Sequence, residues 1–205
     1  MKLNRKFTVL CAALLGVVLI ASCASTGGGG AARQPVGKWT FEDPAGGTQG
    51  WYLANSEFYQ YRGKAELSRD DKTLGKGLLR LDVDFTNEMD AKSEWSEPKM
   101  ANDFPRAFNM KGITRFSFDF YYNPSFDTQG GNFKAKVFSN SNGLKVDFTG
   151  EDITGGTDAG NGFKKAAVEI LIMPNPGFMS DMRFSIAGYL TNYKGPVFFD
   201  NMRWE

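Results

Sequence analysis

Apolar and polar residues alternate with a period of two along most of the chain beyond residue 36, which is the pattern of half-buried β-strands. Residues 115–122 show it most clearly, with three phenylalanines and Tyr122 on one side and Arg115, a serine, an aspartate and Tyr121 on the other. The same alternation predicts strands at 79–85, 133–138, 165–172, 182–187 and 197–204. Shorter runs predict strands at 38–41, 51–54, 58–62, 64–67, 94–99 and 143–148.

Clusters of glycine, proline, asparagine and aspartate separate these segments, as at 43–47, 129–131 and 139–143, and are typical of turns. No long stretch repeats every 3.6 residues, so we expect an all-β domain. About ten short strands in one domain favour an antiparallel β-sandwich, most simply a jelly roll. Residues 149–162 are rich in glycine and are expected to form the longest irregular segment.

The first 22 residues have the features of a secretory signal peptide that is removed. Lys2, Arg5 and Lys6 precede an apolar run from residue 7 to residue 21. This run is shorter than the roughly 20 residues that a membrane-spanning helix needs. We therefore expect the segment 1–22 to direct export and to be absent from the mature protein.

The signal ends in Leu-Ile-Ala-Ser-Cys at 19–23, which resembles the bacterial lipobox, where small residues precede the cysteine that becomes lipidated and N-terminal. An ordinary signal that happens to end near a cysteine is the alternative. We expect a lipid on Cys23, a flexible glycine-rich tether over 23–36 and one folded domain over 37–205. The resemblance implies a protein anchored in the bacterial cell envelope, at the outer membrane or cell surface, which contacts the membrane only through its lipid.

Charge and composition exclude several classes of function. The chain has 24 Lys and Arg against 23 Asp and Glu, and without the three basic residues of the signal the balance is 21 against 23. A near-neutral chain without basic runs argues against a nucleic-acid partner. The lack of histidine excludes Ser–His and Cys–His catalysis and His-ligated zinc or iron. Cys23 is the only cysteine beyond the signal, so no internal disulfide can form, and we expect a monomer.

The last expected strand changes phase part-way along its length. Val197 and Phe199 point to one face, yet Met202 and Trp204 point to the same face, so the alternation slips by one residue between the two pairs. Such a slip indicates a β-bulge at 200–201, where backbone carbonyl groups are released from the ladder.

Motifs at both ends of the domain are similar to those of carbohydrate-binding modules. Phe-Glu-Asp at 41–43 followed by Gln-Gly-Trp at 49–51 resembles the opening of many of these modules, and the run 193–203 resembles their closing strand, with an aromatic segment that ends in Asp-Asn. The segments 75–81, 95–98 and 116–122 fall between them in the expected order. The similarity spans 38–205 and is greatest to the family 27 mannan-binding type, with the family 11 glucan-binding type second.

This resemblance implies a jelly roll that binds a β-linked polysaccharide, with mannan or glucomannan favoured. Flat aromatic rings stack on the C–H faces of sugars, and sugar hydroxyl groups require charged or amide partners. By resemblance, Trp51 and Trp95 match two stacking aromatics, and Phe163 stands where the family has a third ring. The further candidates are expected to form one group on the solvent side of the same sheet, near Trp51 and Trp95, namely Glu94, Arg115, Tyr121, Lys134, Lys136 and Glu169. Each of these could equally belong to an ordinary solvated strand face, and Trp51 or Trp95 could pack under a loop. Trp39 and Trp204 are expected in the core or at a sheet edge.

Glu42, Asp43 and Asp200 are candidate ligands for calcium. Ca²⁺ takes six to eight oxygen ligands and readily mixes carboxylates with backbone carbonyls, so it needs few acidic side chains. In the modules that the chain resembles, a structural calcium ion joins the first strand to the last through acids at the positions of Glu42 and Asp200. The alternative is that these acids lie in solvated turns.

Catalysis is not expected. Paired carboxylates can hydrolyse glycosides without histidine, but no pair of acids stands out from the strand-surface alternation. The sequence thus favours a non-catalytic lipoprotein that binds polysaccharide. A structural or adhesive surface lipoprotein with the same sandwich and no glycan ligand is the alternative.

Overall fold

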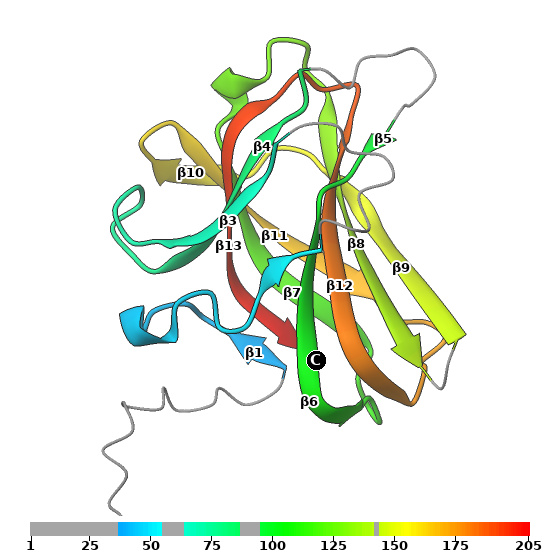
Figure 1. The fold of residues 1–205 in the computed structure, drawn as a ribbon. Coiled ribbons are helices and arrows are strands. Elements are labelled where there is room, and N and C mark those ends of the chain that lie inside the picture. Colours follow the sequence, from blue (N-terminus) through cyan, green and yellow to red (C-terminus); the bar gives the residue numbers. More distant parts are fainter. Residues whose placement is uncertain (1–36, 55–63, 87–94, 142–143) are drawn as a thin grey trace, which may run out of the picture. The chain divides into compact units, whose positions relative to one another are not determined.

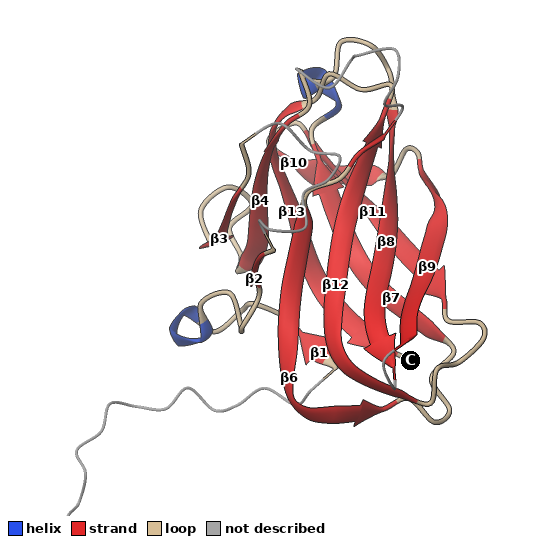
Figure 2. Ribbon diagram, turned by 45° about the vertical axis from the view of Figure 1, so that its right-hand side comes forward, coloured by secondary structure: helices blue, strands red, loops and turns tan. Residues whose placement is uncertain are grey.

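The alternating segments pair into two antiparallel sheets in a computed structural model, which describes residues 37–54, 64–86, 95–141 and 144–205 (Figure 1). The all-β sandwich expected from the sequence is therefore confirmed. Apart from two short 3-10 turns at Pro44–Gly46 and Pro124–Phe126, the secondary structure of these ranges is entirely β. Figure 2 shows the sheets as two layers, and no helix in the described part is long and apolar enough to cross a membrane.

Sheet A has the order β10-β11-β7-β13-β4-β3, and β1 also pairs with β13. Its strands are β1 (Lys38–Trp39), β3 (Glu66–Asp70), β4 (Leu78–Asp84), β7 (Arg115–Tyr122), β10 (Thr157–Gly160), β11 (Phe163–Leu171) and β13 (Lys194–Trp204). Sheet B has the order β2-β6-β12-β8-β9, and β5 also pairs with β12. Its strands are β2 (Tyr52–Leu53), β5 (Trp95–Ser96), β6 (Lys99–Asn109), β8 (Asn132–Ser141), β9 (Leu144–Ile153) and β12 (Phe178–Tyr189).

The core forms where the alternating apolar positions of the two sheets meet. From sheet A, Phe118 and Phe199 contribute rings, and from sheet B Phe184 lies 5.0 Å and 5.3 Å from them between ring centroids. All three rings are at most 2% exposed. Edge-to-face aromatic contacts of this kind add about 0.5–1.5 kcal/mol each beyond the burial of their area. The phenylalanine-rich alternation thus supplies aromatic contacts that join the two layers.

The predicted bulge near the end of the chain is confirmed. The register of β13 against β7 shifts between Asp200 and Arg203, and Asn201 takes a positive φ of 50°. Because of this extra residue, Met202 and Trp204 point into the core on the same side as Phe199. Trp39 and Trp204 are buried there, as expected.

Two expectations about secondary structure were wrong. The segment 149–162 is not an irregular loop, because it contains the end of β9 and the whole of β10. Strand β6 continues beyond Lys99, where no strand was expected, and it contains Pro105. The register of β6 against β12 shifts between Asp103 and Phe108, so the proline lies at an irregularity where a missing N–H group costs no regular pairing. The strand expected at 58–62 lies outside the described residues.

Candidate functional site

The outward side of sheet B carries a continuous set of polar and aromatic side chains. In β12, the core residues Met182, Phe184 and Ile186 alternate with Arg183 and Ser185, which point away from the core. Cross-strand partners in β6 and β8 extend these outward rows to both sides. We call this surface the sheet B face, and its members are Tyr52, Glu97, Lys99, Asp103, Lys134, Lys136, Phe138, Asp147, Arg183, Ser185 and Tyr189.

A carboxylate held by two lysines occupies the middle of the sheet B face. Glu97 is 7% exposed, and its carboxylate lies 3.0 Å from Lys136 Nζ and 3.8 Å from Lys99 Nζ. Ser185 Oγ lies 3.5 Å from the same carboxylate as a potential donor. The register explains this cluster, because Ser185 pairs with Lys99 on one side and with Lys136 on the other. Partners of this kind offset the cost of removing a carboxylate from water.

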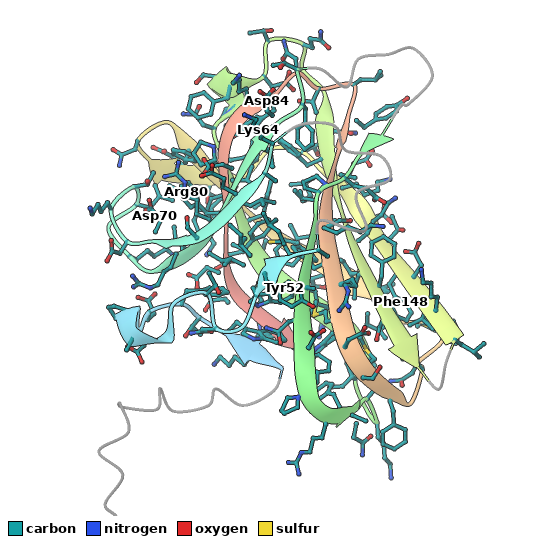
Figure 3. All side chains as sticks on the ribbon, in the orientation of Figure 1. Tyr52, Lys64, Asp70, Arg80, Asp84 and Phe148 are labelled. Carbon is teal, nitrogen blue, oxygen red and sulfur yellow. The ribbon has the colours of Figure 1, made fainter. Side chains whose placement is uncertain are left out.

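A second charged cluster lies in the neighbouring rows of the same face. Arg183 Nη1 lies 3.1 Å from Asp103 Oδ1 and 3.3 Å from Asp181 Oδ2, and the Tyr52 hydroxyl donates to Asp103 Oδ2 at 2.8 Å. Tyr52 is 41% exposed, so one side of its ring is open to solvent while its hydroxyl is held in place (Figure 3).

Two further residues connect the clusters. Lys99 Nζ lies 4.9 Å from the centroid of the Phe138 ring, close enough for a cation–π interaction. Asp147 is paired in register with Phe138, and burial raises the pKa of its carboxyl, a rise that the nearby Lys136 opposes and Glu97 reinforces. The face as a whole therefore presents fixed carboxylate acceptors and ammonium donors next to aromatic rings, an arrangement suited to a ligand that carries many hydroxyl groups.

The structure divides the predicted polar residues between two separate faces. Lys134 and Lys136 lie on the sheet B face, where Lys134 pairs with Asp152 at 2.8 Å. Arg115 and Glu169 lie instead on the outward side of sheet A, in β7 and β11, where they pair with each other at 3.3 Å. The prediction that they form one group with the lysines is therefore wrong.

Three of the predicted aromatic site residues are buried. Trp51 is 2% exposed and packs in the core at 5.3 Å from Trp39 and 6.2 Å from Phe184, measured between ring centroids. Tyr121 and Phe163 are 2% and 5% exposed. None of them can stack on a sugar in this conformation, so their assignment as platform residues is wrong.

The burial of Tyr121 and Phe163 follows from a cover over the outward side of sheet A. These two rings form a small second core with Leu78 and Phe198. The turn between β3 and β4 lies over it and is joined to the β10–β11 turn by a 2.6 Å hydrogen bond from Asn161 Nδ2 to Thr73 O. The middle of this surface is therefore occupied by the protein's own chain.

Trp95 belongs to the sheet B face by its backbone position. It pairs with Tyr189, and the register of β5 against β12 is the same as that of β6, so β5, Glu97, Pro98 and β6 form one strand line interrupted at the proline. Trp95 thus stands two residues before Glu97 in that line. Its side chain and Glu94 lie outside the described part, and their assignment as site residues stays a prediction.

Sequence reasoning missed most of the sheet B face. Asp103 was missed because β6 was not expected beyond Lys99. Glu97 lies in the strand expected at 94–99 but was not selected as a site residue. Arg183 could have been found, since the alternation in 182–187 already sets it opposite Met182 and Phe184. Tyr52 could not have been found in this way. Strand β2 has only two residues, so alternation does not show whether Tyr52 or Trp51 faces the solvent.

The predicted calcium ligands are arranged around side-chain cations. Lys76 Nζ lies 2.6 Å from Asp200 Oδ2 and 2.7 Å from the Tyr121 hydroxyl oxygen. Arg69 Nε donates to Phe41 O at 2.8 Å and Arg69 Nη2 to Glu42 O at 3.3 Å. Both cations come from the β3–β4 hairpin, and together they bind the carbonyls that follow β1 and the carboxylate of β13.

These contacts do not fit a calcium ion. Asp43 instead caps a 3-10 turn by accepting from the Ala45 N–H at 2.9 Å. An ammonium group in direct contact with Asp200 would also repel a divalent ion at the same oxygen. Burial raises the pKa of the Asp200 carboxyl, and the contact with Lys76 opposes that rise.

Comparison with known proteins identifies solved structures with a similar fold. No family model matches the chain, and no curated protein matches it either. Among solved structures, the chain is similar to TmCBM27, a carbohydrate-binding module described by its specific mannan recognition (TM-score 0.57, 18% identity, 82% of this chain and 94% of that chain covered). It is also similar to CBM27-1 of Caldicellulosiruptor saccharolyticus, solved in complex with mannohexaose (0.59, 23%, 82% and 97%). The chain has the β-sandwich fold of carbohydrate-binding modules. A third match is CBM28, a module specific for non-crystalline cellulose (0.59, 20%, 77% and 87%).

Proposed function

We propose that the protein is a non-catalytic lipoprotein that binds a β-linked polysaccharide on the sheet B face, with mannan or glucomannan favoured as the ligand. A lipid on Cys23 holds it at the bacterial outer membrane or cell surface. The observation that carries the proposal is the sheet B face itself, where paired charges and a half-exposed tyrosine follow the strands outside the core.

The chemistry of the face matches that of a sugar chain. Each sugar hydroxyl both donates and accepts hydrogen bonds, and the face offers Glu97 and Asp103 as acceptors beside Lys136 and Arg183 as donors. These side chains are already held by one another, so they lose little conformational freedom when a ligand binds. A polar face with preorganised donors and acceptors therefore suits a neutral, hydroxyl-rich ligand.

An aromatic platform would supply the stacking energy. We assign this role to Trp95, whose backbone lies opposite Tyr189 at one end of the face, with Tyr52 contributing a second ring further along β6. Because Trp51 and Phe163 are buried, Trp95 is the one ring of the three expected from the sequence that remains in the proposed platform, and Tyr52 is added to it.

The structural neighbours support the choice of ligand class. Two of the matched modules are described by mannan recognition or by a bound mannohexaose, and a third by specificity for non-crystalline cellulose. At identities of 18–23% this similarity concerns the fold, and the assignment of a ligand to this chain is our proposal.

Affinity gel electrophoresis tests the proposal with mannan, glucomannan, xylan and mixed-linkage β-glucan in the gel. Retardation by mannan or glucomannan is expected. Trp95→Ala should weaken binding by about 30-fold, since the truncation of an aromatic hot spot commonly costs about 2 kcal/mol. Retardation by none of the four would favour a structural or adhesive lipoprotein instead.

A matched pair of arginine variants localises the site. Arg183→Ala removes the partner of Asp103 on the sheet B face, and Arg115→Ala removes the partner of Glu169 on sheet A. We expect the first to weaken binding several-fold and the second to leave it unchanged. Equal losses in both, or a loss only in Arg115→Ala, would contradict the assignment.

A further inference from the structure

The folded domain begins at one particular end of the sandwich. Gly37 O accepts from Trp204 N at 3.0 Å, and Gly37 packs against the ring of Phe108 near the end of β6. At the same end, Met110 N donates to Gly177 O at 2.8 Å. We call this the tether end. Figure 1 shows β1, the C-terminus and the turn from β6 toward β7 in the lower part of the domain.

Exposed apolar side chains concentrate at the tether end. Leu171 (66% exposed), Met173 (75%) and Phe178 (49%) lie along the connection between β11 and β12, which is joined to the 110–114 turn by a hydrogen bond from Ile172 N to Thr114 O. Leu144 (71%) lies at the β8–β9 hairpin. It is level with the start of β12, because β8 runs antiparallel to β12 and ends there. These four are the majority of the seven large apolar side chains that are exposed in the described ranges.

Basic side chains surround this apolar group. Lys38, Arg106, Lys111 and Lys145 are all exposed at the tether end or on the strands that lead to it. Within the described part of the chain, the structure shows no ion pair for any of the four. Exposed apolar residues ringed by unpaired Lys and Arg are the features of proteins that lie on an anionic bilayer surface.

The tether expected over 23–36 would keep this end close to a membrane if Cys23 carries the proposed lipid. Gly37 is the fourteenth residue after Cys23. A flexible glycine-rich segment of that length has a root-mean-square span of about 20 Å and a maximum reach of about 50 Å. A lipid on Cys23 would therefore give the tether end an effective concentration of about a millimolar at the bilayer surface. At that concentration even weak contacts with the surface are populated.

We propose that the tether end contacts the surface of an anionic phospholipid bilayer, with Leu171, Met173 and Phe178 at the level of the headgroups. The proposal rests on the lipid anchor of the proposed function and is independent of the glycan. In this orientation the sheet B face, which runs along the side of the sandwich, remains accessible to a polysaccharide.

The test uses the single thiol of the chain from residue 23 onward. Cys23 is coupled to a maleimide lipid in vesicles of phosphatidylglycerol and phosphatidylethanolamine, and amide hydrogen exchange is compared with that of the uncoupled protein. Exchange in residues 106–113 and 171–178 should slow by about fivefold on the vesicles. Exchange in residues 187–193, at the opposite end of β12, should remain unchanged.

A pair of variants separates membrane contact from the effect of tethering alone. Met173→Ser combined with Phe178→Ser should abolish the slowing, and Leu190→Ser, which alters an equally exposed residue at the opposite end, should leave it intact. High salt should reduce the slowing, because it screens the basic residues.

Several outcomes would overturn the proposal. Exchange that slows nowhere, or equally at both ends, would show that the domain does not dock through the tether end. A concentration-dependent dimer of the uncoupled protein that the Met173/Phe178 double variant abolishes would assign the patch to a second copy of the chain. Mannan binding measured on the same samples reports separately on the proposed function, so that either idea can fail alone.

Discussion

Replacement of Lys76 by methionine tests whether a side-chain cation, instead of a metal ion, neutralises the buried acid of the last strand. The Asp200 side chain is 3% exposed and its Oδ2 lies 2.6 Å from Lys76 Nζ, so Lys76→Met would leave a carboxylate without its counter-charge in the second core. Removal of one partner of a buried pair costs about 3–5 kcal/mol. Since Lys76 is 34% exposed and water can reach the site, we expect about 3 kcal/mol.

Urea denaturation measures this loss. With a slope of about 2 kcal/mol/M for a domain of this size, the midpoint should fall by about 1.5 M. Lys194→Met is the matched control, because its ammonium lies at a similar distance of 2.8 Å from Asp84 but is 68% exposed. Exposed pairs contribute about 0–1 kcal/mol, so this control should shift the midpoint little.

The pH dependence gives the prediction a second, independent check. Burial already raises the pKa of the Asp200 carboxyl in the folded protein, and loss of Lys76 should raise it further. A raised pKa means that the folded state binds the proton more tightly than the unfolded state, so the free energy of unfolding falls as the pH rises through the folded-state pKa. The deficit of Lys76→Met relative to the parent should therefore be largest at neutral pH and should narrow toward pH 4.

A compensating change completes the test. Asp200→Asn in the Lys76→Met background removes the unpaired charge and should recover most of the lost stability at pH 7. If Lys76→Met costs no more than Lys194→Met, or if Asp200→Asn recovers nothing, the pair does not neutralise a buried charge and the reasoning is refuted.

Three other predictions follow from the same structure. Trp51→Ala should lower the free energy of unfolding by about 3–5 kcal/mol in urea, because the ring lies in the core, and a melting temperature like that of the parent would contradict its burial. Thermal melting with added Ca²⁺ or with a chelator should give the same melting temperature, and a higher melting temperature with Ca²⁺ would support a calcium site at Asp200. Cys23→Ala should move the protein from the membrane fraction to the soluble fraction, and persistence in the membrane fraction would argue against the lipid anchor.

The fold could be predicted because its signal is local. Alternation in 115–122 and 197–204 reflects which side of a strand is buried, and β7 and β13 formed there with the expected faces inward. Even the bulge at 200–201 was visible as a slip of phase. Strand β6 was not expected beyond Lys99 because residues 100–109 do not alternate regularly, and only the pairing with β12 shows that the ladder tolerates Pro105.

The site could be predicted only in part because it depends on which strands become neighbours. Lys136 and Glu169 are both outward residues of alternating strands, and nothing in their own segments indicates that one lies in sheet B and the other in sheet A. Trp51 illustrates the same limit at the level of one residue. Trp51 follows a turn and precedes Tyr52, so either ring could be the exposed one. Trp51 is the buried ring because it packs against Trp39 and Phe184.

The central claim is that the sheet B face binds a β-linked glycan, and NMR titration of the backbone amides with mannohexaose tests it most directly. The account predicts saturable shifts concentrated in β6, β8 and β12, with residues near Glu97, Lys136 and Arg183 among the most affected, and little change in β7 and β11. Shifts that cluster in β7 and β11 would contradict the assignment of the face, and an unchanged spectrum with mannohexaose and with the oligosaccharides of the other gel ligands would contradict glycan binding itself.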